Sequence, residues 1–174
     1  MTRFRGLVWR HVPPGAEPLH LGWILNATRG RWNTRRPRLP CIYTALTAEG
    51  AVAEYERHVA LFGLRGERDL VSIRVDVDDV LDLTSELQRR RRAIPLDAIT
   101  GDEPRDLAAC RRLAVRAVVR DGYGAILAPS AALPDGVNLM VYELRTDHIR
   151  ALMNGPDRVR IGPGRERPPR PPRE

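Results

Sequence analysis

Apolar residues recur along the chain with two periods, one typical of strands and one typical of helices. Residues 42–46 form an apolar run rich in β-formers, and residues 69–77 alternate apolar and polar positions, which predicts a half-exposed strand. Between them, Thr47 is a good N-cap, and Glu49 stands in the first turn of a helix, where negative charge is favoured. The apolar positions that follow have helical spacing and form one stripe: Ala48, Ala51, Val52, Tyr55, Val59 and Phe62. The pattern therefore predicts a buried strand, a turn, an amphipathic helix and a second strand.

Glu54 lies on the flank of that apolar stripe, and His58 lies one turn further along the same flank. Two interpretations are open at this point. The carboxylate could be raised into a cleft, because the strand before the helix carries Tyr43. It could equally form a solvated i,i+4 pair with His58.

The same two periods predict the remaining elements. Strands are predicted at residues 7–12, 125–128 and 137–144, helices at 81–92, 106–119 and 146–153, and irregular segments at 13–39 and 93–104. Strands and helices follow one another without a regular βαβ period, which favours an α+β fold over a doubly wound sheet.

The composition changes near Gly155, from where glycine, proline and arginine dominate. This change predicts a folded domain at residues 1–153 and a largely flexible, solvated tail at 154–174. Within that tail, residues 158–161 could add an edge strand.

The length of 174 residues suits one domain with a real core and is too short for two ordinary ones. Hydrophobic residues make up 43% and charged residues 29%, as in folded globular proteins. No apolar run reaches membrane-spanning length, and the N-terminus lacks the apolar centre of a signal peptide. We therefore expect a soluble, cytoplasmic protein. Cys41 and Cys110 show no metal-ligand spacing and are expected to be reduced, packed thiols.

The net charge is +7, and all 29 basic residues are arginine. This charge favours acidic partners, nucleic acid or phosphorylated small molecules, and the planar guanidinium suits bidentate phosphate contacts. A nucleic-acid surface would also be expected to interleave aromatic residues, but these make up only 5% of the chain. Composition therefore admits an anionic ligand without choosing one.

Common catalytic motifs are absent from the sequence: it contains no GxxxxGK[ST], no GxGxxG after a strand, no GxSxG and no HExxH. The histidines have no ligand spacing, so no metal site is predicted. Ser130, which follows a buried run and a proline, is by itself explained as a turn residue.

Several short motifs nevertheless occur in a distinctive order. An arginine ends the first strand (Arg10), and a GRWN loop at 30–33 follows. IYTA at 42–45, AEYERH at 53–58, GYGAILAPSA at 122–131 and VNL at 137–139 come next. In this order they resemble the RES domain family, which is named for its arginine, glutamate and serine. The resemblance covers roughly residues 5–150.

The resemblance assigns family positions residue by residue. The arginine of the name is best matched by Arg10, with Arg31 of the GRWN loop as a second candidate. The glutamate matches Glu54, which lies eleven residues after Tyr43, and the serine matches Ser130.

The resemblance also covers two binding positions and shows two departures. Tyr43 matches an aromatic residue of the family's pocket, and Asn138 matches the asparagine after the serine loop. The residue after the first arginine is often tyrosine in the family, but here it is His11. The loop reads Arg29-Gly30-Arg31 where Gly-Gly-Arg is commoner, which is a lesser change.

The resemblance implies a fold like that of ADP-ribosyltransferase toxins, with a small split sheet flanked by helices. It implies an enzyme that consumes NAD as substrate, by phosphorolysis with inorganic phosphate or by hydrolysis, without a metal. Some relatives ADP-ribosylate a protein instead. Members usually act as toxins held by an antitoxin with a helix-turn-helix domain, which would cover the active site, and they could form homo-oligomers. A basic nucleic-acid-binding module is the alternative from another class.

Residue chemistry agrees with NAD cleavage. Breaking the nicotinamide–ribose bond builds positive charge on the ribose, which the carboxylate of Glu54 would stabilise. Arg10 and Arg31 would bind the pyrophosphate or an attacking phosphate, so both are predicted to converge beside Glu54. Tyr43 would pack against nicotinamide or its ribose, and Ser130 would hydrogen-bond the carboxamide or a phosphate.

Overall fold

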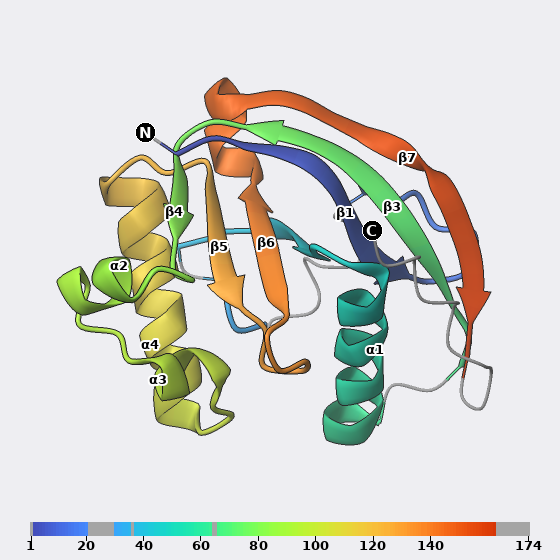
Figure 1. The fold of residues 1–174 in the computed structure, drawn as a ribbon, viewed down its shortest axis with the longest axis horizontal. Helices are drawn as coiled ribbons and strands as arrows, with labels where there is room; N and C mark the ends of the chain where they lie inside the picture. The colour runs from blue at the N-terminus through green and yellow to red at the C-terminus, as the bar shows by residue number, and fades with distance from the viewer. Residues whose placement is uncertain (1, 21–29, 36, 64–65, 163–174) are drawn as a thin grey trace.

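The protein is described by a computed structural model that places residues 2–20, 30–35, 37–63 and 66–162 (Figure 1). Its strands are β1 (Phe4–Val12), β2 (Cys41–Ala45), β3 (Arg68–Val77), β4 (Val80–Asp82), β5 (Ala125–Pro129), β6 (Val137–Tyr142) and β7 (Ile149–Ile161). The helices are α1 (Ala48–Phe62), α2 (Glu86–Arg91), α3 (Leu96–Thr100), α4 (Pro104–Val115), a π-helical turn (Arg116–Arg120) and a 3-10 helix (Glu143–His148). The α+β prediction is confirmed.

The strands form one seven-stranded sheet in the order β4-β5-β6-β2-β1-β3-β7. It is mixed, because β4 and β5 are parallel and the other neighbours are antiparallel. β1 follows β3 along its whole length, but β1 and β2 share a single register pair, Trp9 with Ala45. The sheet therefore divides into a β1-β3-β7 half, beside which α1 lies, and a half with α2, α3 and α4 beside it (Figure 1).

Helix α1 begins after Thr47, as the sequence predicts, and ends at Gly63. The Thr47 hydroxyl accepts a hydrogen bond from Gly50 N at 3.0 Å, and Gly63 ends the helix with φ of 62°, a left-handed conformation that favours glycine. Ala51 and Tyr55 are buried against Ala45 and Leu70 of the sheet. The apolar stripe therefore attaches α1 across the junction between the two halves.

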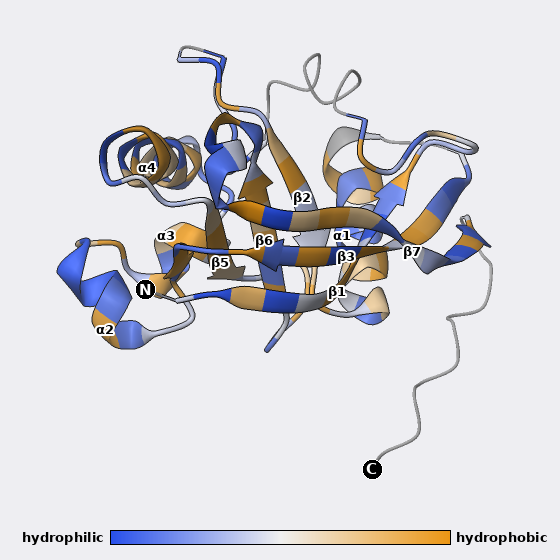
Figure 2. Cartoon of the chain, turned by 90° about the horizontal axis from the view of Figure 1, so that it is seen from above, coloured by the Kyte–Doolittle hydropathy of each residue, from blue (hydrophilic) through white to orange (hydrophobic). Residues whose placement is uncertain are grey.

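Apolar side chains fill both faces of the sheet. One cluster packs beneath α4 and includes Trp32, Cys110 and Tyr142, and the Tyr142 hydroxyl donates to the Trp32 carbonyl at 3.0 Å. A second cluster covers the other face around Val8 and Ile73. Apolar and polar residues alternate along parts of β7, β3 and β1 (Figure 2), as expected where successive side chains point to opposite faces of the sheet. Both cysteines are buried and free of disulfides, as predicted.

The predicted helix at 146–153 is wrong, and so is the predicted boundary after residue 153. The chain turns through the 3-10 helix at 143–148 and then forms β7, which pairs with β3 as far as Ile161 opposite Arg68. Gly155 lies at an irregularity in this pairing, where a Cβ would lie 2.3 Å from Ser72 Oγ. The glycine- and arginine-rich composition does not indicate a strand here, but pairing with β3 stabilises β7 as an edge strand. Residues 163–174 of the predicted tail lie outside the described residues.

Smaller corrections concern the middle of the chain. Residues 81–92 divide into β4 and α2, with Ser85 as the N-cap of α2. The segment predicted as irregular at 93–104 contains α3, and the helix predicted at 106–119 is α4 followed by the π-helical turn. Strand β3 is mostly buried rather than half-exposed, because β1 and β7 flank it and both of its faces are packed. Within the described residues, no helix is long and apolar enough to cross a membrane.

The Asp69 carboxylate joins three segments at the far end of the β1-β3-β7 half. It accepts hydrogen bonds from Gly15 N at 2.9 Å, from Arg158 Nη1 at 2.7 Å and from Arg160 Nε at 2.6 Å. Burial acts to raise the pKa of Asp69, but these hydrogen bonds outweigh it and hold that pKa below its ordinary value. The ionised carboxylate therefore ties β7 to β3 and to the loop that follows β1.

Replacing Asp69 with asparagine keeps the shape of the side chain and removes its charge. We expect the free energy of unfolding at pH 7 to fall by about 1–3 kcal/mol, the range for a hydrogen-bonded charged group. Because the folded pKa lies below the unfolded one, the stabilisation is lost as the pH falls through the folded pKa, and the difference should shrink below about pH 4. Urea unfolding measures both. An equal loss from Asp147→Asn, at a carboxylate whose side chain is 64% exposed, would contradict this assignment.

Candidate functional site

The Glu54 carboxylate lies at the centre of a buried polar cluster. Its residue is 7% exposed, and Oε1 accepts hydrogen bonds from Ser130 Oγ at 2.9 Å and from Asn138 Nδ2 at 2.7 Å. No described residue donates to Oε2. Glu54 is therefore buried rather than solvated, although its charge still acts on His58. One oxygen is thus held by the protein, while the other has no donor among the described residues.

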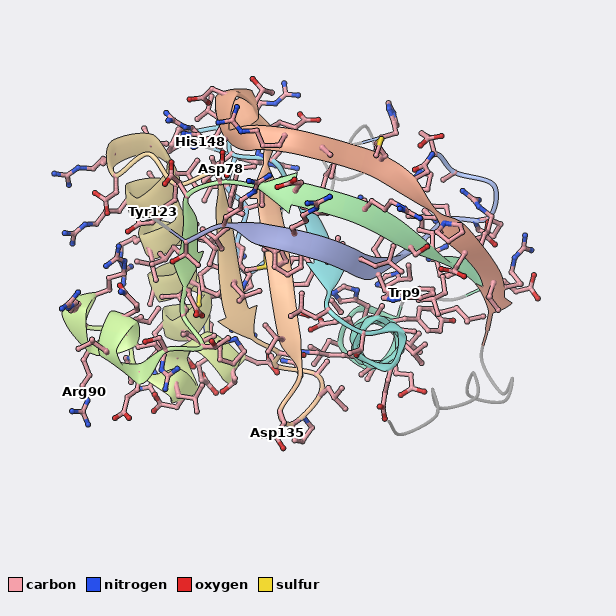
Figure 3. All side chains as sticks on the ribbon, turned by 45° about the horizontal axis from the view of Figure 1, so that its top comes forward. Trp9, Asp78, Arg90, Tyr123, Asp135 and His148 are labelled. Atoms are coloured by element: carbon pink, nitrogen blue, oxygen red, sulfur yellow. The ribbon has the colours of Figure 1, made fainter. Side chains whose placement is uncertain are left out.

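Ser130 reaches Glu54 from the turn between β5 and β6. Its N–H donates to the Gly136 carbonyl at 2.8 Å, and its hydroxyl accepts from Ala132 N at 3.0 Å and from Leu133 N at 3.2 Å. Asp135 marks the tip of this turn in Figure 3. Ser130 is therefore both a turn residue and a donor to Glu54, because its hydroxyl proton is directed at the carboxylate while its oxygen accepts from the turn.

Asn138 and Tyr43 complete the cluster from two paired strands. Register pairs Asn138 of β6 with Ala45 of β2, and the Asn138 amide donates to Tyr43 Oη at 2.9 Å as well as to Glu54. The buried Asn138 Oδ1 has no donor among the described residues. Burial, and then the charge of Glu54, raise the pKa of Tyr43, so its phenol stays neutral.

Arg31 lies on the Tyr43 side of the cluster. Its guanidinium donates to the Gly101 carbonyl at 2.5 Å and to Asp102 Oδ1 at 3.1 Å. The positive charge of Arg31 acts to lower the pKa of Tyr43, which places the two groups within electrostatic reach. The Gly30 carbonyl accepts from Arg111 Nε at 3.0 Å, so the GRWN loop is held against α4. Arg29 of the predicted loop lies outside the described residues.

Arg10 is a buried residue of β1. Along β1, Trp9 and His11 face α1 (Trp9 is labelled in Figure 3), whereas Arg10 alternates to the opposite face. Arg10 is 3% exposed and donates to the Pro18 carbonyl at 2.7 Å. Burial lowers its pKa to about 10, so it stays charged at neutral pH. The predicted convergence of Arg10 and Arg31 beside Glu54 stays a prediction.

His11 packs against α1. Its Nε2 lies 3.2 Å from His58 Nδ1, and its ring meets Tyr55 edge-on with centroids 5.6 Å apart. Burial, the neighbouring His58 and Arg10 lower the pKa of His11 to about 3. Burial also lowers the pKa of His58, although the charge of Glu54 opposes this. The contact between His11 and His58 was not predicted from the sequence. The position of His58 one helical turn after Glu54 was the feature that could have indicated it.

The cluster does not resemble a metal centre. In the part of the chain that the structure describes, no three His, Cys, Asp or Glu side chains are grouped so that they could hold a metal ion. What the arrangement provides is a buried negative charge with one oxygen fixed, an aromatic phenol beside it, and an arginine close to that phenol.

The fold and this cluster define an α+β domain built around a buried glutamate. Residues 7–160 match the RES domain, and the chain belongs to that family. The chain is also similar to a protein in the crystal structure of the M. tuberculosis MbcT–MbcA toxin–antitoxin complex, with a TM-score of 0.72 and 25% identity. That likeness covers 92% of this chain and 86% of the other. A search of curated protein sequences found no match.

The neutral state of His11 makes stability depend on pH. An unfolded histidine binds a proton below about pH 6.5, whereas folded His11 does so only near pH 3. Its contribution is therefore complete above about pH 6.5 and is lost as the pH falls, by at most about 1.4 kcal/mol per pH unit. Urea unfolding at several pH values between 7 and 5 gives the free energy of unfolding as a function of pH. This free energy should fall less steeply with decreasing pH in His11→Gln than in wild type. Parallel slopes would contradict a neutral buried His11.

Proposed function

We propose that the protein cleaves the nicotinamide–ribose bond of NAD. The observation that carries this proposal is the Glu54 carboxylate, which is buried, held at Oε1 by Ser130 and Asn138, and without a described donor at Oε2. A fixed negative charge of this kind stabilises a ribose that becomes cationic during bond cleavage more than it stabilises the ground state.

The reaction requires no oxidant or metal for its balance. The C–N bond to nicotinamide breaks, and nicotinamide leaves with the bonding electron pair. An oxygen of water or of inorganic phosphate then bonds to the same ribose carbon, and the proton of the nucleophile passes to solvent. ADP-ribose or its 1-phosphate results. Transfer to a protein side chain is the competing outcome, and it differs only in the nucleophile that reaches the ribose.

The neighbouring residues divide the binding work. Tyr43, kept neutral by burial and by Glu54, would pack against nicotinamide or its ribose. Asn138 and Ser130 would hold the carboxylate in place, and Ser130 could exchange one bond for the carboxamide or a phosphate. Arg31 would bind phosphate with its planar fork. Arg10, the best match to the arginine of the family name, would also bind the pyrophosphate or an attacking phosphate.

The similarity to the M. tuberculosis toxin–antitoxin structure supports a toxin role with a protein antitoxin as partner. An enzyme that drains NAD must be held inactive, so the antitoxin, which we expect to carry a helix-turn-helix domain, would cover the Glu54 cluster. The net charge of +7 favours a partner with an acidic contact surface, which would also speed association.

Glu54→Gln tests the catalytic role directly. It keeps the volume and an acceptor for Ser130 and Asn138 but removes the charge that matters as the ribose becomes cationic. Turnover of NAD should fall by about a hundredfold or more, while NAD affinity and melting temperature should hold. Nicotinamide release, calorimetric NAD binding and thermal unfolding on one preparation measure all three.

The matched control is Glu56→Gln, on the exposed side of the same helix, which removes the same charge and should leave turnover unchanged. Near wild-type turnover by Glu54→Gln would remove Glu54 from the mechanism. Product analysis with and without phosphate separates hydrolysis from phosphorolysis. If NAD is not cleaved and nucleic acid binds with a steep salt dependence, the basic nucleic-acid module replaces this proposal.

Inhibition by a partner is tested by co-expressing the chain with the neighbouring reading frame. We expect a stable complex whose NAD turnover is at least about tenfold below that of the free enzyme, because the partner covers Glu54. Turnover by the purified complex and by the separated chain is compared at equal concentration. Undiminished activity in the complex would contradict inhibition by occlusion.

A further inference from the structure

The Asp102 carboxylate, between α3 and α4, is bound by two arginines from separate parts of the chain. Arg31 Nη2 of the GRWN loop lies 3.1 Å from Asp102 Oδ1, and Arg57 Nη2 of α1 contacts the same oxygen. The Arg31 side chain is 9% exposed and that of Arg57 is 20% exposed, whereas the Asp102 side chain is 46% exposed. The two cations are thus set into the fold, and the anion between them faces solvent.

This pair of guanidinium groups stands next to the Glu54 cluster. Arg57 follows Glu54 by three residues on α1, so the two side chains lie on neighbouring positions of one helix. Arg31 is held by the Gly101 carbonyl and lies within electrostatic reach of Tyr43. Two positive charges share one carboxylate oxygen, which leaves an excess of positive charge beside the site.

A single carboxylate is a poor match for two forked donors. A diphosphate presents more oxygen atoms and more negative charge, so it can accept paired hydrogen bonds from both guanidinium groups. Asp102 is nearly half exposed, so water can solvate its carboxylate once it is released, while the diphosphate takes over both buried arginines. An incoming diphosphate would therefore exchange with Asp102 readily.

We propose that Arg31 and Arg57 together form the diphosphate-binding subsite of the enzyme and that Asp102 occupies this subsite until the substrate displaces it. The chemical class of ligand is a diphosphate diester, as in a dinucleotide. The identification of that ligand as substrate rests on the proposed function, whereas the anion site itself rests on the shared oxygen contact. This assigns Arg57 as a phosphate-binding residue. Asp102 competes with the diphosphate for the two arginines and so lowers the affinity of the site for it.

Inorganic pyrophosphate is the probe that tests the site without requiring turnover. Calorimetry on the full chain at low salt should show binding that tightens at least about fivefold in Asp102→Asn, because the competing charge is gone. Arg57→Gln should weaken binding at least about fivefold. The matched control, Asp147→Asn, also removes one exposed carboxylate that pairs with an arginine, and it should leave pyrophosphate affinity within about twofold of wild type.

Two results would overturn the inference. If Asp102→Asn lowers the melting temperature and leaves pyrophosphate affinity unchanged, Asp102 is only a clamp between the loop and α1. If Asp147→Asn tightens binding as much as Asp102→Asn does, the effect is one of net charge. Should Asp102→Asn not fold, Arg57→Gln against wild type still decides, since unchanged affinity there excludes Arg57 from the subsite.

The failure of this inference is separable from failure of the proposed function. If the wild-type protein cleaves NAD, we expect the KM for NAD to be at least about fivefold lower in Asp102→Asn than in wild type. In Arg57→Gln, the KM for NAD should be higher than in wild type. Cleavage without these shifts, and without any change in pyrophosphate affinity, overturns the diphosphate subsite alone. Pyrophosphate binding with the expected shifts, but with no cleavage of NAD, overturns the proposed function and leaves the anion site standing.

Discussion

Burial of the Glu54 carboxylate is the constraint on which the site depends. A buried charge is costly unless it is hydrogen-bonded, so Glu54 requires the hydroxyl of Ser130 and the amide of Asn138. Those donors come from the turn after β5 and from the first residues of β6, while the carboxylate comes from α1. The polar cluster therefore requires α1 to keep one position against the β5-β6 end of the sheet, because a displaced helix would take the Glu54 carboxylate away from both of its donors.

The division of the sheet makes room for this arrangement. β1 and β2 meet at one register pair, Trp9 with Ala45, and α1 packs on both residues through Ala51 and Tyr55. The β1-β3-β7 half is held together independently, by the full-length pairing of β3 with its two neighbours and by the ionised Asp69. The apolar stripe of α1 packs across the junction between the two halves, and the flank of that stripe carries Glu54.

The phenol of Tyr43 separates the negative charge of Glu54 from the positive charge of Arg31. Glu54 lies innermost, neutral Tyr43 stands beside it, and Arg31 lies beyond the phenol with its guanidinium bound to Asp102. Among the described residues, no arginine forms a salt bridge with Glu54, and Arg31 is paired with Asp102 instead. His11, kept neutral by burial, adds no positive charge on the α1 side.

Local patterns in the sequence were sufficient for α1 and its Thr47 cap, for most strands and for the α+β class, because period and capping are properties of neighbouring residues. Motif order was sufficient to name Glu54, Ser130 and Asn138. Only the tertiary structure decided that these three meet, since Asn138 lies 84 residues from Glu54 and reaches it through the register of β6. The same holds for β7, whose strand state comes from pairing with β3. Long-range pairing sets such outcomes, and no window of adjacent residues contains it.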